Sequence, residues 1–226
     1  ESSPFLAPVA DKCRVVPFGI RVERFEGSPD TLARADSLRR RHTRPIVLFV
    51  GRLIYYKGVD VLVRAMRDVH ADLVLIGSGP LEGELRERVV ALGMGERVTF
   101  LAPVPEAELV AWYHAADVFC LPSVARSEAY GLVQLEAHAS GTPVVSTALP
   151  TGVPFVNPDG ETGLIVPPGD APALAAALTR LLGDDALRGR MGEQARERAL
   201  ARFSIASMTD GVVGVYSEAV DSRTSR

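Results

Sequence analysis

The chain has 226 residues and a net charge of −3, with 47% hydrophobic and 23% charged residues. This is the composition of a soluble globular protein, and the length suits one large domain or two small ones. Scattered Lys and Arg argue against a nucleic-acid-binding surface, and no apolar run approaches the roughly 20 residues of a membrane span or resembles a signal peptide.

Short runs of β-branched and aromatic residues predict the strands. Residues 13–16 predict a strand at the edge of a sheet. Six further runs are apolar throughout rather than alternating, as in parallel strands that are buried on both faces. They comprise residues 46–50, 73–76, 98–101, 118–121, 144–146 and 163–166.

Helical patterns separate these strands. Pro80 suits a first helical position, and Gly93 and Gly141 suit helix ends. The predicted helices cover residues 59–70, 80–92, 106–114 and 131–140. This alternation predicts an α/β fold: a doubly wound, mostly parallel, Rossmann-like sheet with helices on both faces.

Two regions differ from this alternation. Residues 26–44 carry five arginines and no clear apolar face, so they predict a surface loop or a short exposed helix. After Pro172 the chain is helical, with helices predicted at residues 173–182, 186–203 and 205–220.

The start of the helix after the fourth central strand carries the main functional signal. Glu128 precedes this helix and Glu136 lies about two turns further on, with seven mostly apolar residues between them. The first backbone amides, near Gly131, Leu132 and Val133, are unpaired donors at the positive end of the helix dipole. They can hold an anion between two carboxylates that bind hydroxyl groups, which is the pattern of a sugar nucleotide. The alternative is two solvated acids that flank an ordinary core helix.

A loop with two cations follows the first central strand, in the order Gly51, Arg52, then Lys57 and Gly58. Ligands of doubly wound sheets bind beyond the carboxyl ends of strands, so Arg52 and Lys57 emerge where an anion would lie. Arg offers a planar fork to phosphate oxygens and Lys a mobile point charge. The alternative is a pair of solvated loop cations.

These motifs, in this order, resemble those of retaining glycosyltransferases with the GT-B fold, especially glycosyltransferase family 4. The resemblance covers about residues 13–203. It implies that Glu128 binds the donor sugar, Glu136 binds the ribose, and Arg52 and Lys57 clamp the diphosphate. Glu128, Arg52 and Lys57 are thus the residues expected to carry the reaction.

The other predicted site residues contact the nucleotide. Tyr130 belongs to the same motif as Gly131, Leu132 and Val133 at the helix start. Pro103 and Val104 lie in a segment that resembles the one presenting backbone groups to the base. Ala102 stands where family members often carry Gly, which leaves the identity of the base open.

The sequence lacks the motifs of dinucleotide-binding, P-loop and zinc-binding proteins. There is no Gly-x-Gly-x-x-Gly after a strand and no P-loop. The four histidines, His42, His70, His114 and His138, show no zinc-binding spacing, and His138 is interpreted as a packed histidine. We expect no metal and no cofactor besides the donor substrate. Cys13 and Cys120 cannot form a disulfide framework, and Cys120 is predicted to be a buried thiol, which favours a reducing cytoplasm.

The resemblance implies the C-terminal, donor-binding half of a two-domain enzyme. Residues 1–12 would be a remnant of the interdomain crossover, residues 13–203 the nucleotide-sugar-binding domain, and residues 204–226 a C-terminal helix. Such a helix often crosses back to the first domain, so here it must pack on its own sheet or expose an apolar face. The isolated chain is expected to bind nucleotide weakly and to turn over little or nothing.

The expected reaction transfers a hexose from a nucleotide-diphosphate sugar to a glycan or lipid-linked acceptor, bound through the missing N-terminal domain. Residues 149–157 look like those of bacterial surface-polysaccharide and O-antigen mannosyltransferases, which favours GDP-mannose slightly over UDP-sugars. The expected location is cytoplasmic, with peripheral association at the inner face of the cell membrane as an option for the full enzyme. The alternatives are a non-catalytic nucleotide-sugar-binding module, or another GT-B enzyme such as a nucleotide-sugar epimerase or a glycan phosphorylase.

Overall fold

The computed structural model describes residues 5–224. Residues 1–4 of the predicted crossover remnant and residues 225–226 of the predicted last helix lie outside the described residues. One parallel sheet of six strands, in the order β3-β2-β1-β4-β5-β6, forms the centre of the molecule. The strands are β1 Ile46–Val50, β2 Asp72–Ile76, β3 Val98–Leu101, β4 Val118–Leu121, β5 Val144–Thr147 and β6 Gly163–Val166.

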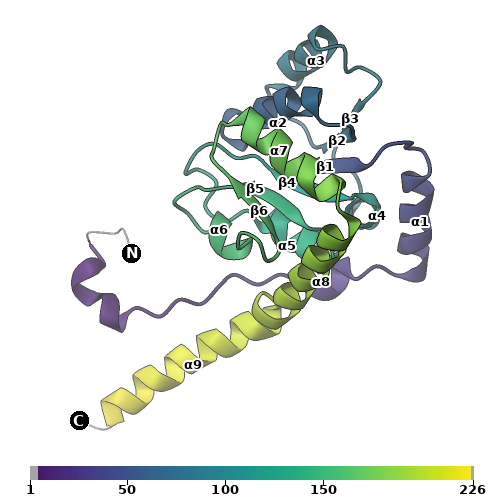
Figure 1. Cartoon of the computed structure of the whole chain (residues 1–226). Helices are drawn as coiled ribbons and strands as arrows, with labels where there is room; N and C mark the ends of the chain where they lie inside the picture. The colour runs from purple at the N-terminus through teal and green to yellow at the C-terminus, as the bar shows by residue number, and fades with distance from the viewer. Residues whose placement is uncertain (1–4, 225–226) are drawn as a thin grey trace.

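Helices cover both faces of the sheet (Figure 1). The helices are α1 Pro29–Arg39, α2 Val59–Ala65, α3 Glu82–Ala91, α4 Glu106–Ala115, α5 Leu132–Ala139, α6 Val153–Val156, α7 Ala171–Leu182, α8 Asp185–Arg202 and α9 Ile205–Thr224. Short 3-10 turns lie at η1 Ala7–Lys12, η2 Val22–Phe25, η3 Tyr55–Lys57 and η4 Met66–Asp68. The predicted α/β class with a doubly wound parallel sheet is therefore confirmed.

Alternate residues of the four inner strands, β2, β1, β4 and β5, enter two separate cores, whereas the edge strands β3 and β6 are less completely buried. In β1, Val47 and Phe49 pack with α2, α3 and α7, whereas Ile46 and Leu48 pack with α1, α4 and α5. Side chains of a strand alternate between the faces of a sheet, so a strand that is buried on both faces must be apolar throughout. Cys120 lies in the first core, and burial raises the pKa of its thiol well above the usual range.

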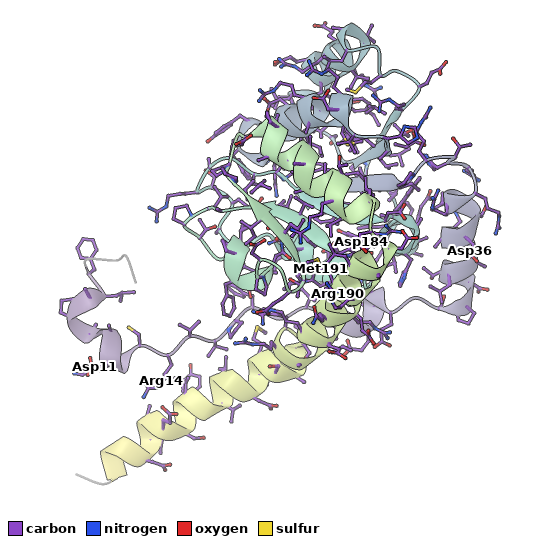
Figure 2. All side chains as sticks on the ribbon, in the orientation of Figure 1. Asp11, Arg14, Asp36, Asp184, Arg190 and Met191 are labelled. Atoms are coloured by element: carbon purple, nitrogen blue, oxygen red, sulfur yellow. The ribbon has the colours of Figure 1, made fainter. Side chains whose placement is uncertain are left out.

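The predicted edge strand at residues 13–16 is wrong. This segment is extended but lies outside the sheet, with Val15 85% exposed. It runs beside α9, where Arg14 pairs with Glu218 at 3.2 Å (Figure 2). Strand propensity is not enough to form a strand when no neighbouring edge supplies the hydrogen bonds.

Helix boundaries differ from the prediction in two places, and the arginine-rich region takes the second of its two predicted forms, a mostly exposed helix. α2 ends at Ala65 and continues only as the 3-10 turn η4, so the predicted helix at residues 59–70 is too long. α3 begins at Glu82, two residues later than predicted, and Pro80 lies in the turn before it. The arginine-rich region forms α1, which Ser28 caps by accepting a hydrogen bond from the Thr31 amide. α1 packs on α4 and buries Ala35 and Leu38, so a narrow apolar side does exist.

α9 leaves the body of the molecule together with the N-terminal segment (Figure 1). Both depart at one point, where the Ile20 amide donates to Phe203 O at 2.7 Å and the Ile205 amide donates to Ile20 O at 3.1 Å. Of the two outcomes expected for this helix, the second holds, since α9 exposes an apolar face. The exposed residues of this face are Val212, Val213, Val215, Tyr216 and Val220. No helix within residues 5–224 combines the length and hydrophobicity that a bilayer span requires.

His138 on α5 is fully buried, as predicted for a packed histidine, and burial lowers the pKa of its ring to about 3. Neither ring nitrogen has a hydrogen-bond partner within residues 5–224. Asn157 interacts with the ring and opposes the shift, but its amide is engaged with Val144 O and Ser146 Oγ. His138 is therefore a neutral core residue.

This burial predicts a loss of stability in acid. The unfolded chain protonates His138 near pH 6.5 and the folded chain only near pH 3, so the contribution is complete above pH 6.5 and is lost as the pH falls between these values. The slope attributable to His138 is about 1.4 kcal/mol per pH unit. In urea unfolding at pH 7.5, 6 and 5, the wild type and the exposed control His70→Gln should lose about 1.4 kcal/mol more than His138→Gln between pH 6 and pH 5, and less between pH 7.5 and pH 6. An unchanged slope in His138→Gln would contradict the assignment.

Candidate functional site

The site lies where the strand order reverses, between β1 and β4. The chain after β1 leads to α2 on one face of the sheet, and the chain after β4 leads to α5 on the other. The two connections diverge and leave a crevice at the carboxyl ends of these strands, which is where doubly wound sheets bind ligands. All the predicted cations and acids lie on these two connections or on α5.

Lys57 and Glu128 meet at this point. Lys57 Nζ donates to Glu128 Oε2 at 2.6 Å, and Ser123 Oγ donates to the same oxygen at 2.9 Å. The side chains of Lys57 and Glu128 are only 12% and 8% exposed. The two hydrogen bonds and the positive charge of the ammonium group offset the cost of burying the carboxylate charge. The sequence motifs assigned Lys57 and Glu128 to different parts of a ligand, and their direct pairing was not predicted.

The backbone brings the two connections into contact. The Val124 amide donates to Tyr56 O at 2.8 Å. Gly58 has a φ of +63°, and a Cβ at this position would overlap the carbonyl oxygen of Pro122. Glycine is therefore required at residue 58 both for the left-handed backbone and for the close approach of the two loops.

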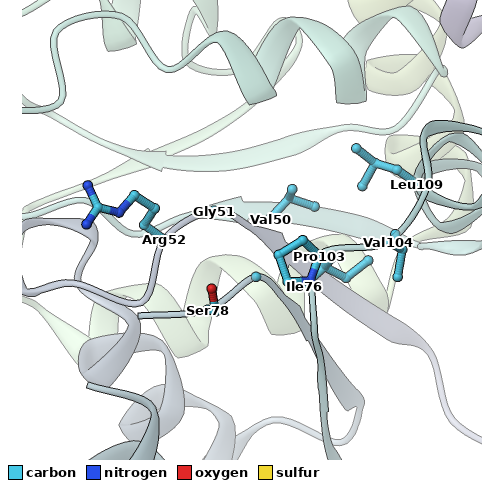
Figure 3. A pocket seen from close by; sticks show the side chains of 9 residues that line it. Val50, Gly51, Arg52, Ile76, Ser78, Pro103, Val104 and Leu109 are labelled. Carbon is cyan, nitrogen blue, oxygen red and sulfur yellow. The ribbon is translucent and has the colours of Figure 1, made fainter. Parts of the chain in front are cut away.

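Arg52 lies at the edge of an adjoining cavity of about 260 Å³ (Figure 3). Its guanidinium is exposed, has no partner within residues 5–224, and extends away from the apolar residues of the cavity. These apolar residues are Val50, Ile76, Pro103, Val104 and Leu109. The cavity thus offers an apolar surface beside the exposed Arg52 guanidinium, and it includes two of the predicted base-contacting residues.

The start of α5 lies at the end of the connection that follows β4. Gly131 caps the helix with a φ of +72°, and its carbonyl accepts from the Gln134 amide at 2.9 Å. The amides of Leu132 and Val133 have no acceptor within residues 5–224. They are the unpaired donors expected at a helix N-terminus.

Glu136 lies on α5 at a second cavity of about 430 Å³. Val104 and Leu109 line both cavities, so the two adjoin. Tyr113, which is fully buried on α4, donates its hydroxyl to Glu136 Oε2 at 2.7 Å. Burial raises the pKa of Glu136, and the Tyr113 hydrogen bond opposes this shift.

Tyr130 lies apart from these cavities. Its ring makes edge contacts with Phe18 and Phe203, and its hydroxyl donates to Phe18 O at 3.4 Å. Tyr130 therefore links the start of α5 to the point where the N-terminal segment and α9 leave the domain.

Sequence reasoning missed Ser123, Tyr113 and Thr147. Thr147 Oγ1 donates to Ser123 O at 2.6 Å, and all three side chains are buried. Serine and threonine at strand ends are too common to stand out, and Tyr113 follows the pattern of a core helix. No His, Cys, Asp or Glu cluster suited to a metal ion occurs within residues 5–224.

Comparison with known proteins places the chain among glycosyltransferases. Residues 32–198 match the protein family described as glycosyl transferases group 1. The chain is 40% identical to D-inositol 3-phosphate glycosyltransferase of Corynebacterium diphtheriae, over 92% of this chain and 51% of that protein. It is 31% identical to O-antigen chain mannosyltransferase C of Escherichia coli, over 99% of this chain and 59% of that protein.

A solved structure shares the fold. That of Anabaena HepE in complex with UDP matches with a TM-score of 0.83 over 91% of this chain and 57% of that chain, at 22% sequence identity. The chain spans about half the length of the curated relatives that it matches.

Proposed function

Because the chain belongs to the glycosyl transferases group 1 family, we propose that it is the donor-binding half of a glycosyltransferase that uses a nucleoside-diphosphate sugar. The observation that carries the proposal is the buried Lys57–Glu128 pair at the point where the strand order reverses. The pair places a cation and a hydroxyl-binding carboxylate side by side, as a sugar attached to a diphosphate requires.

The reaction moves the sugar to a hydroxyl group of an acceptor and leaves a nucleoside diphosphate. Negative charge builds up on the leaving diphosphate as the bond to the sugar breaks. Lys57, Arg52 and the free amides of Leu132 and Val133 are the groups that would offset this charge. No protein nucleophile is assigned, so retention of configuration would follow a front-face route in which the leaving phosphate assists the attack of the acceptor.

The base would occupy one of the two adjoining cavities and the ribose the other. The apolar cavity bounded by Pro103 and Val104 suits the flat face of a base. Glu136, held by Tyr113 in the adjoining cavity, suits the ribose hydroxyls. Glu128 would then meet the sugar, on the far side of the diphosphate.

The identities of the sugar and the acceptor are proposed from the relatives rather than from the geometry of the site. The O-antigen mannosyltransferase among the relatives supports mannose as the hexose. The resemblance of residues 149–157 to such enzymes favours GDP-mannose over a UDP-sugar. The structure of Anabaena HepE was solved with UDP, which keeps UDP-sugars as the alternative. A glycan or lipid-linked acceptor would bind mainly to the missing half of the enzyme, at the inner face of the cell membrane. The chain would therefore bind the donor but would not turn it over alone.

The N-terminal segment and the apolar face of α9 are proposed to contact that missing half. The alternative, a module that only binds nucleotide sugar, fits the half-length chain equally well. Measuring sugar transfer after the other half of a full-length relative is added in trans separates these two functions.

Calorimetric titration with GDP, UDP, GDP-mannose and UDP-glucose tests the donor site. We expect saturable binding of one nucleotide class, weakened about tenfold by Arg52→Ala and by Glu136→Gln, because each substitution removes a charged hydrogen-bonding group. Arg64→Ala is the matched control, since Arg64 is an exposed arginine on α2 that pairs with Asp60. Equal affinity in Arg52→Ala, Glu136→Gln and the wild type would refute the assignment of these residues.

A further inference from the structure

The two cations of the β1 loop are held differently. Arg52 is exposed and has no partner in the described part of the chain, whereas Lys57 is buried against Glu128. A long side chain loses rotamer entropy when a ligand fixes it, and a side chain that is already fixed does not. Lys57 is therefore oriented before a ligand arrives, and Arg52 is not.

Ser123 completes the arrangement that orients Lys57. It is fully buried, and its hydroxyl donates to the same Glu128 oxygen that Lys57 contacts. Its backbone carbonyl is held by Thr147 at the end of β5. The contacts thus run from β5, through the segment after β4, to the loop after β1, and each is made by a buried side chain.

Glu128 uses its two oxygens unequally. Oε2 accepts from both Lys57 and Ser123, while Oε1 has no partner within residues 5–224. Oε1 is not fully buried, so it keeps contact with solvent. The carboxylate turns one oxygen to the protein and leaves the other free for a ligand hydroxyl.

We propose that Ser123 is a positioning residue of this site: it fixes Glu128 so that Oε2 holds Lys57 toward the diphosphate and Oε1 stays free for the sugar. This role rests on the proposed donor-binding function. Without the Ser123 hydroxyl, the carboxylate loses one of its two donors and can rotate about its last bond. The Lys57 ammonium then loses its fixed place.

The composition of the chain makes this test specific. Lys12 and Lys57 are its only lysines, beside 23 arginines. Selective 15N-lysine labelling therefore gives two side-chain signals, one from the buried Lys57 and one from the exposed Lys12 as an internal control. The rate at which the Nζ protons exchange with water reports how firmly each ammonium is held.

Ser123→Ala is expected to speed the exchange of the Lys57 protons about tenfold, the loss expected for one hydrogen bond to a charged group, and to leave Lys12 unchanged. GDP or UDP, whichever the wild type binds, should bind about tenfold more weakly. Thr147→Val should shift both readouts in the same direction while keeping the Ser123 hydroxyl. Ser140→Ala is the matched control, because it removes a hydroxyl at the far end of α5, where it donates to Glu136 O and Phe25 O.

The outcomes separate the two proposals. If the wild type binds a nucleotide and Ser123→Ala matches it in both readouts, the positioning role is overturned. If the wild type binds neither nucleotide, the donor site of this chain is overturned, and the Lys57 exchange rate alone still decides whether Ser123 holds the pair. Should Ser123→Ala fail to fold in a thermal unfolding check, Thr147→Val decides the question through the same two readouts.

Discussion

Replacing Lys57 by methionine is expected to destabilise the fold by about 3 to 5 kcal/mol, the usual cost of removing one partner from a buried ion pair. The Glu128 carboxylate, 8% exposed, would keep only the Ser123 hydroxyl as a donor. Methionine preserves most of the volume of lysine, so the lost charge rather than a cavity causes the effect. Equilibrium unfolding in urea at pH 7 measures the loss.

Two further variants show whether the pair itself is responsible. Lys12→Met makes the same substitution at an exposed lysine and should change stability by less than about 0.5 kcal/mol. The double variant Lys57→Met/Glu128→Gln should recover a large part of the loss, because no buried charge remains unpaired. A single-variant loss below about 1 kcal/mol, or a double variant no better than Lys57→Met, would mean that solvent already screens the pair.

Replacing Gly58 by alanine is expected to cost about 2 to 5 kcal/mol in total. The left-handed backbone at residue 58 costs a non-glycine residue about 1 to 2 kcal/mol. The new methyl group also meets the Pro122 carbonyl and the Val124 side chain, which adds about 1 to 3 kcal/mol of overpacking. Because this contact holds the β1 and β4 loops together, Gly58→Ala should also speed the proton exchange of Lys57.

Gly93→Ala separates the two contributions. Gly93 has a similar φ of +67°, but within residues 5–224 no atom beyond its own chain neighbours lies within 4 Å of the position its Cβ would take. This control carries the backbone strain without the clash and should cost about 1 to 2 kcal/mol. Urea unfolding of both variants gives the cost of the clash by difference. If Gly58→Ala and Gly93→Ala lose the same stability, the loops after β1 and β4 are free to separate and the site is not rigid.

The sequence identified most residues of the candidate site, but it did not predict which of them contact one another. A charged residue beside a predicted buried strand or helix start can be recognised from the sequence alone. This is how the sequence indicates Arg52, Lys57, Glu128 and Glu136. Lys57 and Glu128 are 71 positions apart, and their pairing requires β1 and β4 to be neighbours in the sheet. Ser123 carries no such signal, since a serine after a strand usually caps a turn.

The sequence by itself determined the class of the fold and the extent of most elements. Apolar runs and helical periodicity are local properties, and local sterics and side-chain burial decide them. The same local reasoning failed at residues 13–16, which have strand propensity but no neighbouring edge. At α1 it allowed an exposed helix but missed the narrow buried side, which becomes visible only against α4. Only the tertiary structure decided which loops meet. The strand order brings the loops after β1, β4 and β5 together, and contacts between distant segments depend on that order rather than on any local pattern.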